Sequence, residues 1–254
     1  MTEPDAPAWP LGPGTDARAR AWLVEGAPLG PAPRPAASLC LLRDEPDRAG
    51  SRAVQVLWIT RGRQLVVAPG ALAFPGGAVD DVDRVRRPDE PAPPDRFAVL
   101  SRAAARELAE ETGHVVAPRT MGPLVRWVTP EHEPRRFDTT FLVAVLPPGE
   151  DPEPLPPGEV HEHGWARPVD LLADVASGRR TALPPTRAVL ARLAGAVGNA
   201  LPTGRAAAVV AVLLRRAVLV PVVPRAAWRE GDDNPDDTAR GVDLLLPRHA
   251  GEVP

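Results

Sequence analysis

Residues 74–113 read FPGGAVDDVDRVRRPDEPAPPDRFAVLSRAAARELAEETG and carry the strongest signals for fold and chemistry in the chain. They open with a glycine-rich turn followed by acids. They end in a segment rich in Ala, Leu, Arg and Glu, for which we predict a helix that stops at Gly113. Side chains three and four residues apart share a helix face, so Glu107, Glu110 and Glu111 are expected within one arc. A charged, proline-rich segment separates the two parts.

The three glutamates have two explanations. Like charges at these spacings destabilise an isolated helix by roughly a few tenths of a kcal/mol per pair. In the first explanation, Arg106 pairs with Glu110 one turn later, and the helix is an ordinary solvated one. In the second, the carboxylates bind a divalent cation. The helix by itself favours the first explanation, because solvated helices rich in Arg and Glu are common.

The remaining chain alternates strand and helix signals. Apolar, β-rich runs predict strands at 36–43, 53–60, 123–129 and 137–146, placed on both sides of a helix that Asp95 would cap. A second helix is expected over 169–178, a third behind an N-cap at Thr186, and further strands at 217–223 and 242–246. Strands around a central helix, with more helix following, indicate a mixed α/β or α+β sandwich.

The composition is that of a globular protein. Of 254 residues, 44% are apolar and 25% charged, so a hydrophobic core is expected. The net charge of −3 gives no electrostatic reason to expect nucleic acid or an anionic membrane as a partner. The single cysteine, Cys40, excludes an intramolecular disulfide. The most apolar region, 206–223, contains Arg215, Arg216 and Pro221, so we predict no membrane span and a cytoplasmic protein.

The helical segment RELAEETG (residues 106–113), preceded by FPGG, resembles the Nudix box of the Nudix hydrolases. In that box, a glycine and, six residues later, a glutamate form the front half, and an Arg-Glu helix ending in Glu-Glu, any residue and Gly forms the second half. Here Gly77 is followed by Asp83, where the family has glutamate, and His114 stands at the final apolar position. The resemblance implies that the shorter Asp83 still pairs with the box arginine, Arg106.

The spacer between the two halves is unusually long. The family has seven residues there, whereas this chain has 22, at positions 84–105, and hence 15 extra. An excess of this length is expected only for a functional or surface loop, which we place at about 84–98. An interrupted box, together with RRFDTTF at 135–141, resembles the branch that contains the peroxisomal-type acyl-coenzyme A diphosphatases. The fuller coenzyme A signature is only partly present, because Val66 stands where an arginine is expected.

The resemblance implies a fold and an activity. The fold would be a Nudix α/β/α sandwich with a mixed β-sheet at 35–198, a proline-rich N-terminal extension at 1–34 and a packed C-terminal extension at 199–254. The activity would be metal-dependent hydrolysis of the diphosphate in a small nucleoside diphosphate joined to another moiety. That substrate is coenzyme A or acyl-coenzyme A, or else an ADP-sugar or dinucleotide. The alternative of a different class is a non-catalytic nucleotide-binding Nudix domain. The oligomeric state stays open, with a homodimer as one option.

The resemblance also implies roles for individual residues. Mg²⁺ or Mn²⁺ would be held by Glu107, Glu110 and Glu111, with the main-chain carbonyl of Gly77 as a further ligand. Arg106 and Asp83 would orient these glutamates. The general base would be either a helix glutamate or a glutamate in the loop ahead of Trp165, namely Glu159 or Glu162. The residues expected to contact the substrate are Arg135, Arg136 and Phe74.

Overall fold

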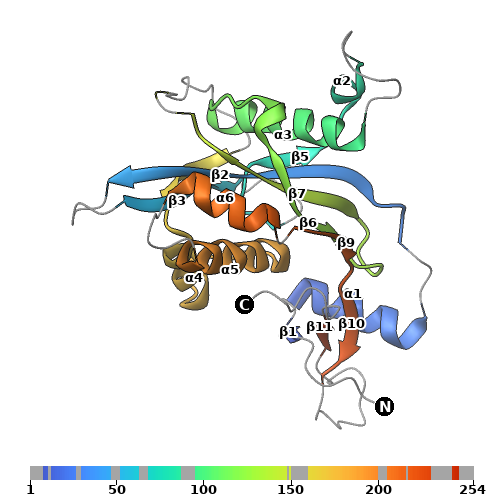
Figure 1. Ribbon diagram of the computed structural model, residues 1–254. Coiled ribbons are helices and arrows are strands. Elements are labelled where there is room, and N and C mark those ends of the chain that lie inside the picture. Colours follow the sequence, from blue (N-terminus) through green and yellow to red (C-terminus); the bar gives the residue numbers. More distant parts are fainter. Residues whose placement is uncertain are drawn as a thin grey trace.

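The computed structural model describes residues 8–10, 13–26, 30–46, 52–62, 68–86, 95–147, 149, 160–199, 205–215, 217–229 and 242–245. Within these residues the main body is an eight-stranded mixed sheet with helices on both faces (Figure 1). The α/β/α sandwich with a mixed sheet that the sequence predicts is therefore confirmed.

Of the eight strands of the main sheet, five follow the expected runs at 36–43, 53–60, 123–129, 137–146 and 217–223, and three were not expected. Their bounds are β2 Arg34–Pro46, β3 Arg52–Arg61, β4 Leu72–Ala73, β5 Gly76–Ala78, β6 Gly122–Val128, β7 Phe137–Val145, β8 Val160–Ala166 and β9 Val218–Val222. The order is β4-β3-β2-β7-β6-β9, with β5 paired to β2 and β8 paired to β3. The pairs β2–β7 and β6–β9 are parallel, and the other pairs are antiparallel.

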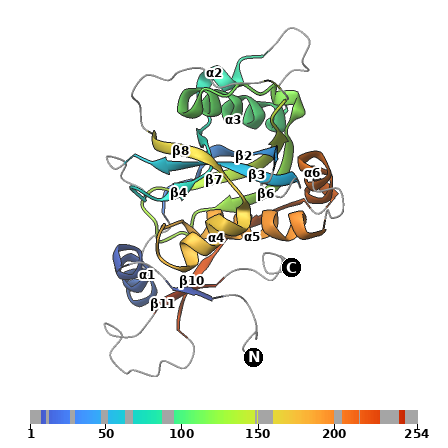
Figure 2. The same ribbon diagram turned by 90° about the vertical axis from the view of Figure 1, so that its left-hand side faces the viewer.

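Helices cover both faces of this sheet (Figures 1 and 2). Helix α3 (Arg96–Thr112) covers one face, with the four-residue helix α2 (Asp81–Arg84) beside it, and the opposite face is covered by α4 (Pro168–Ala176), α5 (Pro184–Asn199) and α6 (Ala206–Arg215). Successive strand residues point to opposite faces. Leu39 and Leu41 of β2 therefore pack with Leu108 of α3, whereas Cys40 and Leu42 pack in the α4–α6 layer.

The ends of α3 lie where the sequence places them. Asp95 occupies the N-cap position, although its side chain makes no capping hydrogen bond. At the other end Gly113 has φ 73°, in the left-handed region, and its N–H donates to the carbonyl of Ala109 at 3.0 Å. A residue without Cβ adopts this conformation at little cost, which explains the glycine stop.

One local expectation is wrong, and one helix was not expected. Thr186 is not an N-cap, because α5 begins two residues earlier, at Pro184. Prolines suit the first turn of a helix, since their φ is fixed near the helical value and the N–H that they lack has no partner there. The segment Ala206–Arg215 is helix α6, for which the apolar run had given no helix prediction. No helix among the described residues combines the length and apolar character that crossing a bilayer requires.

A smaller unit combines the two ends of the chain. Helix α1 (Pro13–Glu25) packs on a three-stranded sheet of β1 (Ala8–Pro10), β11 (Val242–Leu245) and β10 (Arg225–Trp228). Figure 1 shows this unit beside the main sandwich, below the β6–β7 end. Arg18 of α1 bonds Glu133 of the β6–β7 turn at 3.0 Å. Helix α6 and strand β9, both beyond residue 198, pack into the main sandwich. The domain boundaries at 34/35 and 198/199 stay predictions.

Asp138 joins the start of α3 to two strands of the sheet. It lies on β7, and its carboxylate accepts bonds of 2.6 and 2.7 Å from Arg126 of β6 and one of 2.8 Å from Arg96 of α3. Burial alone would raise the pKa of Asp138, but the bonds from Arg126 and Arg96 hold that pKa below its usual value. The carboxylate therefore stabilises the fold in its ionised form.

Asp138→Asn should lower the free energy of unfolding by about 2 kcal/mol at neutral pH, because it weakens charge-assisted hydrogen bonds. The depressed pKa means that this stabilisation is present above the unfolded-state pKa of about 3.9 and is lost as the pH falls through the lower folded-state pKa. Urea denaturation at pH 7 and at pH 3 measures both effects.

The matched control is Asp174→Asn, which also removes a carboxylate paired with two arginines, Arg179 and Arg180, but nearer to solvent. We expect a change within about 0.5 kcal/mol for this variant. An Asp138→Asn deficit that is the same at both pH values would contradict the role of the ionised carboxylate.

Candidate active site

The two ends of residues 74–113 meet in space. Strand β5 and the short helix α2 (Asp81–Arg84) carry the front half, and α3 lies across them. The glycines make this approach possible. A Cβ on Gly76 would overlap the main chain of Ala37 in β2, and a Cβ on Gly77 would overlap the carboxylate of Glu107. The two halves of the box are therefore in contact, despite the insertion between them in the sequence.

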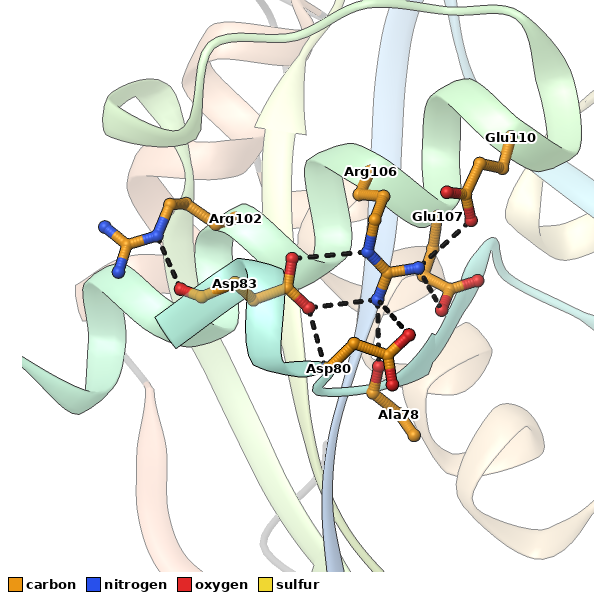
Figure 3. A network of polar contacts seen from close by, with 7 residues as sticks. All are labelled: Ala78, Asp80, Asp83, Arg102, Arg106, Glu107 and Glu110. Carbon is orange, nitrogen blue, oxygen red and sulfur yellow. Dashed lines mark hydrogen bonds and ion pairs between the residues drawn. The ribbon is translucent and has the colours of Figure 1, made fainter. Parts of the chain in front are cut away.

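Arg106 is the residue that joins the halves. Its Nε donates to Oδ1 of Asp83 at 3.2 Å, and its Nη2 donates to Oδ2 at 3.0 Å, so the ion pair is bidentate (Figure 3). Nη2 also donates to the main-chain carbonyl of Ala78 at 3.0 Å. Asp83 is almost fully buried, and its Oδ2 accepts from the N–H of Asp80 at 2.9 Å. The shorter acid thus makes the pairing that the box resemblance implies.

The same guanidinium holds the helix glutamates. Nη1 of Arg106 donates to Oε1 of Glu107 at 2.9 Å and to Oε2 of Glu110 at 3.0 Å (Figure 3). The hydrogen bond to Asp83, followed by the charge of Glu107, raises the pKa of Arg106. Burial raises the pKa of Glu107, although Arg106 opposes the shift, and the charges of Glu110 and Asp80 add to it. One arginine therefore faces an excess of negative charge.

Glu111, one turn after Glu107 on α3, completes the glutamate set. Its Oε2 accepts from the N–H of Gly76 at 2.9 Å, while the main chain of Gly77 lies against Glu107. Oxygen atoms of carboxylates and of the main chain are the ligands that hard divalent cations prefer, and both are present here. Among the described residues, however, no three His, Cys, Asp or Glu side chains are already grouped as a metal site. The glutamate oxygens are instead turned toward Arg106 and the N–H of Gly76.

Glu162 lies away from this cluster. On β8, Trp165 packs with the core on the α3 side, while Gly164 faces Trp58 in the core on the opposite side. Alternation along the strand places Glu162 on the same side as Gly164. Its exposed carboxylate is 3.8 Å from Nη1 of Arg180. The other candidate base, Glu159, lies outside the described residues.

The contacts described for the predicted substrate-binding residues are with other parts of the chain. Arg136 donates to the carbonyls of Thr129 and Pro31, both at 3.1 Å, and so holds the β6–β7 turn to the preceding segment. Arg135 is exposed in the same turn. Phe74 is buried and packs edge-to-face on Phe141. Substrate contact by these residues stays a prediction, since packing accounts for the position of Phe74.

Sequence reasoning missed two residues of the site, Asp80 and Arg102. Asp80 and Asp83 form a capping box at the start of α2, and their spacing in the sequence is the signal that could have found Asp80. Arg102 donates from Nε to the main-chain carbonyl of Asp83 at 2.7 Å, and no motif points to it. His114, at the box position that is usually apolar, is buried against the ring of Trp165, where burial lowers its pKa, so it fills a packing position.

Comparison with known proteins agrees with this geometry. The family model of the NUDIX domain matches residues 32–185. A crystal structure of a NUDIX hydrolase from Alicyclobacillus acidocaldarius is 28% identical, with a TM-score of 0.54, over 65% of this chain and 92% of that one. A search of curated proteins found no match.

Two further solved structures are similar at lower sequence identity and lower TM-score. An Ap4A hydrolase binary complex from C. elegans is 18% identical, with a TM-score of 0.42, over 65% of this chain and 98% of that one. The NUDIX domain of Shewanella oneidensis NrtR, complexed with ADP ribose, is 18% identical, with a TM-score of 0.39, over 60% of this chain and 84% of that one.

The sandwich and the box held together by Arg106 are those of a Nudix domain. The family match covers more than half of the chain, so the chain belongs to the Nudix family. Members of this family generally use divalent metal ions such as Mg²⁺ or Mn²⁺.

Gly77→Ala should lower the free energy of unfolding by at most about 1 kcal/mol, because the added methyl group overlaps only the carboxylate end of Glu107, which can move aside at the cost of its hydrogen bond from Arg106. In a Glu107→Ala background the same change should cost clearly less, since the overlapping group is gone. Urea denaturation of the four proteins in this cycle measures the difference.

Gly198→Ala is the control, because a Cβ at that position meets no atom within 4 Å. It lies in α5, where alanine is favoured over glycine, so we expect no loss of stability. Equal costs of Gly77→Ala with and without the Glu107 carboxylate would show that the close approach is not the cause.

Proposed function

We propose that this protein is a metal-dependent hydrolase that cleaves the diphosphate of a nucleoside diphosphate joined to another moiety. The observation that carries the proposal is the double contact of Arg106. One guanidinium binds Asp83 of the front half and both Glu107 and Glu110 of the helix half. A split box whose halves merely resembled the motif would have no reason to be bound together in this way.

The residues present fit a divalent cation. Glu107, Glu110 and Glu111 project from one half of α3, and burial with neighbouring negative charge already raises the pKa of Glu107. Together with the carbonyl of Gly77 they would hold Mg²⁺ or Mn²⁺, which would neutralise charge on the diphosphate and lower the pKa of the attacking water. Arg106 donates to Glu107 and Glu110, and the N–H of Gly76 donates to Glu111, so each of these carboxylates is already held in place.

Each residue then has a defined task. Asp83 holds the guanidinium of Arg106, and Arg106 sets the direction of Glu107 and Glu110. Glu110 is the most exposed of the three glutamates, so it can accept a proton from a water at the open side of the cluster. The geometry supports a helix glutamate as the general base over Glu162, which lies on the other side of the sheet.

The identity of the substrate is a finer proposal. The interrupted box supports coenzyme A or acyl-coenzyme A, by resemblance to the branch that shares this insertion. An ADP-sugar or a dinucleotide is the alternative within the same chemistry, because every one of these molecules contains the diphosphate on which the box would act. Arg135, Arg136 and Phe74 remain proposed contacts for the rest of the substrate.

A nucleotide-binding domain without catalysis is the alternative of a different class. Asp83 in place of glutamate is the feature that favours it. The complete set of helix glutamates and the intact pairing of Asp83 with Arg106 favour the enzyme, since binding alone would not require clustered carboxylates.

A hydrolysis panel tests the proposal directly. The substrates are coenzyme A, acyl-coenzyme A, ADP-ribose, NADH and diadenosine polyphosphates, each with Mg²⁺ or Mn²⁺. We expect turnover of at least one, and a fall in kcat of about 10²–10⁴ for Glu110→Gln and Glu111→Gln, as for loss of a catalytic acid–base or metal-binding group.

Glu162→Gln is the matched control, an exposed glutamate changed in the same way on the other face of the sheet. We expect it to keep most of the wild-type activity. Nucleotide binding without turnover of any substrate would establish the binding domain instead. Turnover that survives both helix substitutions would place the active site elsewhere.

A further inference from the structure

Arg102 is a buried cation next to the box but outside its motif. It lies on α3 one turn before Arg106, with only 8% of its surface exposed, between the buried residues Ser101 and Ala103. Residues four apart share a helix face, so both arginines point toward α2. Burying a guanidinium is costly unless it is well bonded, so its position requires an explanation.

The two arginines hold opposite ends of one residue. Arg106 binds the carboxylate of Asp83, and Arg102 donates to the main-chain carbonyl of the same residue at 2.7 Å (Figure 3). A carboxylate held only through its side chain can still move with its backbone. Holding the carbonyl as well fixes both the position and the direction of Asp83.

Helix α2 needs this support. It has four residues, too few for a helix to be stable by itself, and the last carbonyls of any helix lack partners within it. The carbonyl of Asp83 is one of these, and Arg102 supplies its donor. Residues 85–95 connect α2 to α3, and a connection of that length leaves the position of α2 on α3 to be set by contacts such as this one.

We propose that Arg102 is a positioning residue of the active site, which closes the base of the insertion and fixes Asp83 so that Arg106 directs Glu107 and Glu110. The inference rests on the proposed function for its effect on catalysis. It explains how this chain keeps a working box with 15 extra residues between the halves. Arg102 would touch neither substrate nor metal, and it would act through Asp83.

The first test uses no catalysis. Arg102→Met keeps the length and the apolar stem of the side chain and removes the donor. Hydrogen exchange of the peptide covering 80–86 should become at least tenfold faster, and the Kd for Mn²⁺, by isothermal titration calorimetry, should rise about tenfold to a hundredfold. Unchanged exchange and unchanged Mn²⁺ affinity would overturn the proposal.

The second test asks whether Arg102 acts through Asp83. With a substrate from the panel, Arg102→Met should lower kcat about tenfold to a hundredfold and leave KM nearly unchanged. In an Asp83→Asn background the same change should have little further effect, because the direction of Arg106 is already lost. Equal losses in both backgrounds would show a merely structural role.

Two further variants keep these tests decisive. Arg102→Lys keeps a donor and a charge, so it should retain part of the Mn²⁺ affinity that Arg102→Met loses. If Arg102→Met does not fold, Arg102→Lys is compared with the wild-type protein in the same assays, and a smaller loss is expected. No loss in Arg102→Lys would then overturn the proposal. The control is Arg96→Met, because Arg96 lies on the same helix but binds Asp138 instead of Asp83. Hydrogen exchange of residues 80–86 in this variant should match that of the wild-type protein. If the wild-type protein turns over no substrate, the proposed function fails, yet exchange and Mn²⁺ binding still decide the role of Arg102.

Discussion

The bidentate pair between Arg106 and Asp83 is the contact on which the candidate site depends. It is largely shielded from water, with both of its bonds within 3.2 Å, and it spans a gap of 22 residues in the sequence. Surface ion pairs contribute little to stability, but a buried and bidentate one fixes geometry as well as adding energy. Because the same guanidinium binds Glu107 and Glu110, the position of Asp83 is passed on to the glutamates.

Close packing makes that pair possible. Gly76 and Gly77 let β5 run against β2 on one side and against Glu107 on the other. The carboxylates gathered there repel one another, and burial raises the pKa of Glu107 further. Such a cluster is unfavourable for folding unless a cation compensates it, and in the described structure Arg106 is the cation within hydrogen-bonding distance. An unfavourable contribution of this cluster to the free energy of folding is consistent with a binding site rather than with a cluster that only stabilises the fold.

The two faces of the sheet have separate tasks. The face under α3 carries the box, and the face under α4–α6 carries the larger hydrophobic core. The bond network of Asp138 fastens the start of α3 to β6 and β7, so the helix is held at both ends, by Asp138 near Arg96 and by the box near Arg106. A rigid helix is a suitable support for carboxylates that must keep their spacing. Glu162 belongs to the other face, and there it contacts Arg180.

The sequence by itself determined the sandwich class, the course of α3 with its stop at Gly113, and the placement of Glu107, Glu110 and Glu111 on that helix. These follow from local rules, namely strand and helix periodicity, glycine at a left-handed position and the spacing of a motif. It did not reveal the start of α5 at Pro184 or helix α6, because apolar runs have similar patterns in buried strands and buried helices. Tertiary structure brought Asp83 to Arg106, as the box resemblance implies, and it alone decided that Arg102 holds the Asp83 carbonyl and that Glu162 faces away. The physical reason is that these contacts depend on how separate elements pack and on which side of a strand a residue points, and a motif read along one chain records neither.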